Sequence, residues 1–202
     1  MNAAKIRLSP EEQELVFSPD WILTKNRILD KVKELLAGVQ EEYAAVLNRT
    51  SGFPNEVLKY GYKISRGENY LGLPWLVLDY PRCFEKEDTF AIRTLFWWGK
   101  FFSFTLQLAG RYKERYEEKI AGAMKVLGGS GFYICMEDDP WQHHFEPSYY
   151  RPVNGMMPEE FNAAIRDKAF LKIAARFPLQ QWEDVPVLLG RKFQEMMTLV
   201  SD

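Results

Sequence analysis

Histidine, cysteine and net charge are all scarce in this sequence, and each shortage argues against a class of protein. Two histidines and two cysteines occur among 202 residues. With 26 basic and 28 acidic residues, the formal net charge of −2 gives no field that attracts a polyanion, so we expect no nucleic-acid partner. Two cysteines are too few for a disulfide framework, and we expect Cys83 and Cys135 to be free thiols.

Long apolar runs are missing as well. No stretch approaches the ~18 uninterrupted apolar residues of a membrane-spanning helix, and residues 1–10 lack the apolar segment of an export signal. We therefore expect a cytoplasmic protein with no membrane partner. No linker, repeat or low-complexity segment divides the chain, so residues 1–202 are expected to form a single α+β domain.

Aromatic side chains are abundant by contrast. They make up 15% of the chain, as 14 Phe, 10 Tyr and 6 Trp. Each ring removes roughly 150–250 Å² of surface from water when it is buried, so the rings are expected to dominate the core. Some of them are expected to line a pocket.

Helix signals frame both ends of the chain. Ser9-Pro10-Glu11-Glu12 predicts a short helix, and Ser18-Pro19-Asp20 begins a long one. Apolar residues follow in the long helix at helical spacing, namely Trp21, Ile28, Val32, Leu35, Val39, Tyr43 and Leu47. A second stripe predicts a carboxy-terminal helix near 184–200, namely Val185, Leu189, Phe193, Met196 and Val200.

The middle of the chain alternates between strand and helix signals. Strands are predicted over 60–65, 73–80 and 131–136, and a polar turn is predicted at 66–69. Helices are predicted over 111–127, closed by Gly128-Gly129, and over 158–166. Residues 168–177 fit a helix or a strand equally well. Residues 137–157 are expected to form an irregular loop of a length that is often functional.

A central hairpin is predicted from Thr89–Trp98 and Phe101–Ala109, joined by the two-residue loop Gly99-Lys100. In that register a mixed polar and aromatic side carries Trp98, Phe101, Phe96, Ser103, Thr94, Thr105, Ile92 and Gln107. The apolar side carries Trp97, Phe102, Leu95, Phe104, Arg93, Leu106, Ala91 and Leu108. Arg93 would then have to snorkel, find an acid such as Asp79, or meet a ligand.

We expect an α+β fold: an antiparallel sheet of about four or five strands around hairpin 89–109, packed against the long N-terminal and C-terminal helices.

Residues 137–146 gather both histidines, His143 and His144, with four carboxylates. These are ligand types for zinc or manganese, but their spacing fits no metal signature, and adjacent residues of an extended chain point to opposite sides. We therefore predict no metal ligand and no cofactor. A histidine general base would need a nucleophile, and Ser130 lies in a Gly-rich helix stop rather than in a nucleophile elbow.

Four basic residues, Lys63, Arg66, Arg82 and Arg93, lie among tyrosines. Arginine beside aromatic rings binds carboxylate or phosphate groups. Salt bridges to nearby acids are the simpler interpretation, and we favour them for all but Arg93.

Our leading hypothesis is a domain that binds a small molecule, with residues 137–151 closing over the mixed side of the hairpin. The predicted ligand-binding residues are Arg93, Trp98, Thr105, Gln107, Trp141, His143, His144 and Tyr150. Two alternatives stay open. One is a metal-assisted or histidine-based hydrolase that uses the same loop, and the other is a protein-interaction module or homo-oligomer anchored by exposed rings such as Trp97 or Trp141.

Overall fold

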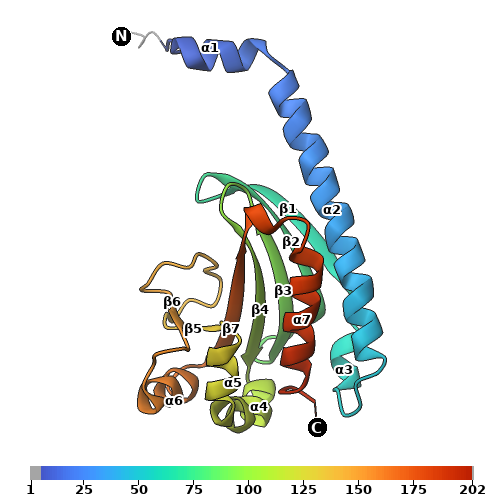
Figure 1. The fold of residues 1–202 in the computed structure, drawn as a ribbon, viewed down its shortest axis with the longest axis vertical. Coiled ribbons are helices and arrows are strands. Elements are labelled where there is room, and N and C mark those ends of the chain that lie inside the picture. Colours follow the sequence, from blue (N-terminus) through green and yellow to red (C-terminus); the bar gives the residue numbers. More distant parts are fainter. Residues whose placement is uncertain (1–5, 202) are drawn as a thin grey trace.

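A seven-stranded antiparallel sheet forms the centre of the computed structural model, which describes residues 6–201 (Figure 1). Residues 1–5, part of the segment in which we expect no export signal, lie outside the described residues. The strands are β1 (Lys63–Tyr70), β2 (Leu73–Phe84), β3 (Thr89–Trp97), β4 (Phe101–Ala109), β5 (Tyr133–Cys135), β6 (Tyr150–Pro152) and β7 (Phe170–Pro178). Their order in the sheet is β1-β2-β3-β4-β7-β5-β6. The predicted α+β class is confirmed, with more strands than expected.

The helices are α1 (Pro10–Phe17), α2 (Asp20–Leu47), α3 (Asn55–Leu58), α4 (Arg111–Gly122), α5 (Met124–Gly129), α6 (Pro158–Arg166) and α7 (Val185–Met197), with a 3-10 turn, η1 (Leu179–Gln181). All of them except α1 lie on one face of the sheet. The long helix α2 and the carboxy-terminal helix α7 lie beside each other over the sheet, as expected, and α4 to α6 close one end of the core (Figure 1). Among residues 6–201, no helix has the length and apolar character to cross a membrane.

The apolar stripes predicted for α2 and α7 form much of the core. Val32, Val39, Tyr43 and Leu47 are buried in α2, and all five residues of the carboxy-terminal stripe are buried. The ring of Tyr43 stacks on Phe193 of α7 with centroids 3.9 Å apart, and its hydroxyl shares a hydrogen bond of 3.1 Å with Thr94 Oγ1. One large side chain thus joins two helices to the sheet and satisfies its polar atom within the core.

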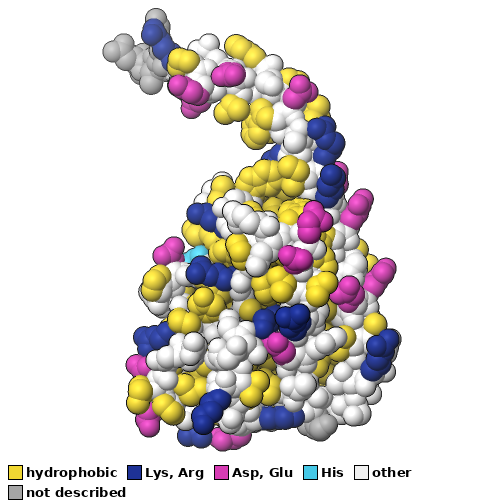
Figure 2. Space-filling view, viewed as in Figure 1, with side chains coloured by type: hydrophobic (Ala, Val, Ile, Leu, Met, Phe, Trp, Pro, Cys, Tyr) yellow, Lys and Arg dark blue, Asp and Glu magenta, His cyan; other side chains and the backbone are white. Residues whose placement is uncertain are grey.

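The beginning of the predicted stripe is not buried, because α1 and the first turns of α2 extend past the sheet as an arm, residues 10–28 (Figures 1 and 2). The capping box expected at Ser9 is present, with Glu12 N donating to Ser9 Oγ and Ser9 N donating to Glu12 Oε2. Six large apolar side chains of the arm are exposed, namely Leu15, Val16, Phe17, Trp21, Ile22 and Leu23.

The register predicted for the central hairpin is wrong by one residue. Trp97 pairs with Phe101, so the loop has three residues, Trp98-Gly99-Lys100. Lys100 N donates to Trp97 O over 3.0 Å, and Gly99 has φ of +67°. Gly99 therefore occupies the third position of a four-residue turn, where a positive φ is needed, and not the first position of a two-residue loop.

This shift reverses the face assigned to every residue of β3. The core face carries Phe90, Ile92, Thr94 and Phe96, opposite Phe102, Phe104, Leu106 and Leu108. The other face carries Ala91, Arg93, Leu95 and Trp97, opposite Phe101, Ser103, Thr105 and Gln107. Arg93 therefore does not point into the helix-covered core. It shares a face with Thr105 and Gln107.

Other boundaries differ from the predictions, and the choice left open for residues 168–177 is decided in favour of a strand. β1 continues through residues 66–69, and the turn comes at Leu71-Gly72, both of which have positive φ. The helix expected over 111–127 is divided at Ala123. The expected irregular loop contains the short strand β6, which pairs with β5. Residues 170–178 form β7, which joins β4 to β5; six of its residues in succession are buried because both of its faces are covered.

Candidate functional site

A cavity of about 510 Å³ opens on the sheet face opposite the helices, over β1, β2 and β3. Its lining consists of Lys63, Ser65, Asn69, Tyr70, Trp75, Val77, Asp79, Arg82, Phe84, Arg93, Leu95, Trp141 and His143. The first eleven come from the three strands and the last two from the loop after β5. The cavity therefore has a wall of regular strands and one wall made by a loop.

An irregularity in β2 determines which residues reach the cavity. Asp79 pairs with Arg93 and Arg82 pairs with Ala91, so three steps along β2 match two steps along β3. The extra residue changes the alternation, because a strand without it would turn Arg82 and Phe84 to the core face. With the extra residue, Arg82 and Phe84 lie on the same face as Trp75, Val77 and Asp79.

The floor of the cavity is formed where Trp75 lies against β1. A Cβ atom added to Gly67 would lie 2.6 Å from the Trp75 ring, so the ring rests on bare backbone. Any side chain at position 67 would displace that ring. Glycine is needed here for close approach rather than for an unusual φ.

Residues 136–149, which we name the covering loop, lie over the part of the sheet beside the cavity. Met136 N donates to Tyr149 O at its base, and His143 N donates to the Tyr70 hydroxyl over 2.7 Å. At its tip, Asp139 accepts from Trp141 N and from Gln142 Nε2, which lowers the pKa of Asp139. These bonds fix the side of the cavity from which Trp141 and His143 project.

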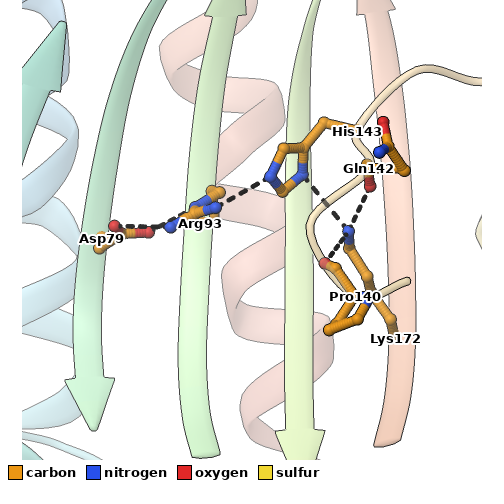
Figure 3. Close-up of polar contacts among 6 residues, drawn as sticks. All are labelled: Asp79, Arg93, Pro140, Gln142, His143 and Lys172. Carbon is orange, nitrogen blue, oxygen red and sulfur yellow. Dashed lines mark hydrogen bonds and ion pairs between the residues drawn. The ribbon is translucent and has the colours of Figure 1, made fainter. Parts of the chain in front are cut away.

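A row of polar groups links β2, β3, the covering loop and β7 (Figure 3). Arg93 Nε and Nη2 contact the two carboxylate oxygens of Asp79 at 2.7 and 3.0 Å. Arg93 Nη1 lies 2.9 Å from His143 Nε2, and His143 Nδ1 lies 3.3 Å from Lys172 Nζ. Lys172 Nζ also donates to the carbonyl oxygens of Pro140 and Gln142.

This row fixes the position of its protons. An arginine guanidinium only donates, so His143 Nε2 must accept and the ring proton lies on Nδ1. Nδ1–H then needs an acceptor, which Lys172 provides only as a neutral amine; its two remaining N–H bonds point to the two carbonyl groups. Consistent with this, burial lowers the pKa of Lys172 to about 7. Burial, together with the charge of Arg93, lowers the pKa of His143 well below its ordinary value.

Three of the eight predicted site residues line the cavity, namely Arg93, Trp141 and His143. Arg93 forms an ion pair with Asp79, which is one of the three outcomes expected for it from the sequence. Its guanidinium carbon lies 5.8 Å from the ring centre of Trp141 and 6.0 Å from that of Phe84. These two rings, whose centroids are 6.0 Å apart, form the mouth.

The other five predicted residues lie elsewhere. Thr105 and Gln107 are buried, and so is Tyr150, whose ring stacks on Phe145. Burial raises the pKa of Tyr150. His144 is buried against Tyr149, with ring centroids 3.9 Å apart. Trp98 lies on the core face, where it contacts Phe96 and borders a groove beside α2.

Two further sequence interpretations need correction. Trp97, expected as an exposed anchor, is 4% exposed because the shifted register packs it with Val77 and Leu95, whereas Trp141 is 54% exposed. Salt bridges were favoured for Lys63, Arg66 and Arg82, yet none of the three pairs with an acid in residues 6–201, and Lys63 and Arg82 face the cavity. The position of Lys63 and Arg82 among tyrosines was the signal that could have assigned them to the site.

The comparisons with known proteins give no family for this chain. No protein-family model, no curated protein and no solved structure matches it. Among residues 6–201, no three His, Cys, Asp or Glu side chains form a group able to hold a metal ion, and Cys83 and Cys135 are buried free thiols. The function therefore has to be argued from the geometry of the cavity.

Proposed function

We propose that the protein binds a small organic molecule in the cavity over β1, β2 and β3. The observation that carries this proposal is a hollow of about 510 Å³ walled by Trp75, Phe84 and Trp141. Sites for small molecules are clefts of this size, mostly apolar, with a few fixed polar groups that orient the ligand. The strands and the row from Asp79 to Lys172 hold those groups in place before any ligand arrives.

The same geometry favours binding over hydrolysis. A general base needs a free lone pair, and His143 Nε2 already accepts from Arg93 while Nδ1 faces Lys172. His144 lies against Tyr149 and does not line the cavity. His143 therefore acts in this proposal as the link between the covering loop and the sheet.

Filling the cavity tests the proposal. Ser65 lines it, and Ser65→Trp would place an indole inside, whereas Val187→Trp adds the same group at an exposed site on α7. We expect a library of small organic compounds, screened by ligand-observed NMR, to give a set of mutually competing binders. Ser65→Trp should abolish their binding and Val187→Trp should retain it. A library without binders, or binders that Ser65→Trp leaves unaffected, would refute the proposal.

A cytoplasmic location is part of the proposal. Its support is that both thiols are buried and unpaired, which suits a reducing compartment.

We propose, second, that the arm associates with a second copy of this chain. The arm carries an exposed apolar ridge, Leu15, Val16 and Phe17, and borders a groove lined by Trp21, Ile28 and Trp98. A two-fold pair can place the ridge of each copy in the groove of the other, because an isologous interface needs complementary patches on one molecule. Exposed apolar surface of this kind marks interaction sites.

Light scattering after size exclusion measures this association. We expect the mass of a dimer for the native chain and of a monomer for Phe17→Glu, while Val187→Glu, an exposed control on α7, should stay dimeric. A native chain that elutes as a monomer at about 100 µM, the upper range of weak interfaces, would refute the second proposal.

A further inference from the structure

Two cations in the cavity have no counter-charge. Lys63 and Arg82 both line it, and within residues 6–201 their side chains make no ion pair or hydrogen bond. Arg82 Nε is buried and has no acceptor. Buried guanidinium N–H groups are normally satisfied, so an unmatched one at a cavity wall points to an acceptor supplied from outside the chain.

The other charges of the cavity cancel. Arg93 is held by both carboxylate oxygens of Asp79, and His143 is neutral because its Nε2 accepts from Arg93. The cavity therefore retains two positive charges, from Lys63 and Arg82, and no negative charge to balance them.

The apolar part of the cavity is flat-sided. Trp75 lies on Gly67 at one end of the cavity and Phe84 and Trp141 stand at the other, because Trp75 pairs with Trp97 and Phe84 with Thr89, at opposite ends of β3. Indole and phenyl faces bind planar rings by stacking, so the Phe84–Trp141 pair, which lies on the same face as Arg82, favours a planar ring over a branched aliphatic group.

We propose that the ligand is an aromatic acid, with a planar ring system against the Phe84–Trp141 pair and a carboxylate or phosphate bound by Arg82 and Lys63. This inference rests on the proposed function and names the chemical class of its ligand. Arg82 Nε–H donates to one oxygen of the acid group, and Lys63, at the exposed rim, contributes charge.

Matched probes test the acid group. The panel consists of aromatic acids of one and two rings with the corresponding amides and amines, among them indole-3-acetate, indole-3-acetamide and tryptamine. Phenyl phosphate and benzoate compare the two kinds of acid, and inorganic phosphate tests an anion without a ring. We expect the acids to bind at least about tenfold more tightly than their amides, as charge-assisted hydrogen bonds require. Amines and inorganic phosphate should bind more weakly still.

Substitutions of the two cationic residues test whether they cause the preference for acids. Arg82→Gln should remove the preference for acid over amide, and Lys63→Gln should reduce the preference several-fold. Lys100→Gln removes a charge on the exposed β3–β4 turn, outside the cavity, and should leave the preference intact. Lys63 is exposed, so its variant reports on the charge even if Arg82→Gln folds poorly.

The outcomes separate the two claims. If acids and amides bind the native chain equally and Ser65→Trp abolishes both, the acid inference fails while the proposed function stands. If no probe binds, or binding survives Ser65→Trp, both fail. A preference for acids that persists in Arg82→Gln and in Lys63→Gln overturns the assignment to these two residues.

Discussion

Replacing Arg93 by methionine is expected to lower the free energy of unfolding by about 3–5 kcal/mol. Asp79 is 6% exposed, and both of its carboxylate oxygens contact Arg93. Without the guanidinium, a buried carboxylate loses its partner, and His143 Nε2 loses its donor. Equilibrium denaturation by urea at pH 7.5 measures the loss.

A double substitution and a surface pair serve as controls. Asp79→Leu combined with Arg93→Met removes both charges, and we expect most of the lost stability to return, because an apolar pair of similar size has no uncompensated charge. Arg166→Met breaks the exposed pair with Glu118, at 3.1 Å, and should cost about 0–1 kcal/mol. If Arg93→Met lowers the free energy of unfolding by no more than Arg166→Met does, the Asp79–Arg93 pair does not stabilise the site.

The stability of the native chain, measured relative to Lys172→Met, is expected to rise as the pH rises from 7 toward 10.5. The pKa of Lys172 is lowered from 10.5 to about 7 by burial. Between these values the unfolded chain holds the proton and the folded chain does not, so unfolding takes up one proton and a higher pH opposes it. The expected slope is about 1.4 kcal/mol per pH unit, and it disappears below pH 7, where both states hold the proton.

Denaturation of both proteins between pH 6 and 9 measures this difference. Taking the difference between the two cancels the contribution of groups that both share, including the buried tyrosines and thiols. Lys86→Met removes an exposed charge and is the matched control. Curves for Lys172→Met and the native chain that stay parallel from pH 7 to 9 would show that Lys172 is charged in the fold, and the proton positions assigned to His143 would then be wrong.

The features that could be predicted from the sequence depend on local periodicity. The stripes of α2 and α7 follow from helical spacing, and the alternation of Trp75, Val77 and Asp79 in β2 follows from the period of a strand. The presence of a central hairpin was predicted from the glycine turn between two alternating strands. Each of these patterns records which side of one element is buried.

The features that were missed depend on single-residue shifts in phase. The turn around Gly99 has three residues rather than two, and this alone moved Arg93 from the predicted core face to the cavity. The irregularity between Asp79 and Arg82 similarly turned Arg82 from the core face toward the cavity. Neither shift changes the hydrophobic pattern around it, so periodicity alone does not reveal it.

Lys172 was missed for a different reason. It lies in the apolar run of β7, which fits a helix or a strand, and its partners are backbone carbonyls about 30 residues away along the chain. Contacts between a side chain and a distant backbone leave no pattern in the sequence. The covering loop was expected to be functional, but the residue that anchors it was not identifiable.

The structure of the complex with the tightest-binding aromatic acid of the panel tests the central claim most directly. We predict that its ring lies against Phe84 and Trp141 and that an oxygen of its acid group accepts from Arg82 Nε, which lacks an acceptor in the free protein. An acid group that points to solvent, or a ligand bound anywhere outside the cavity, would contradict the account.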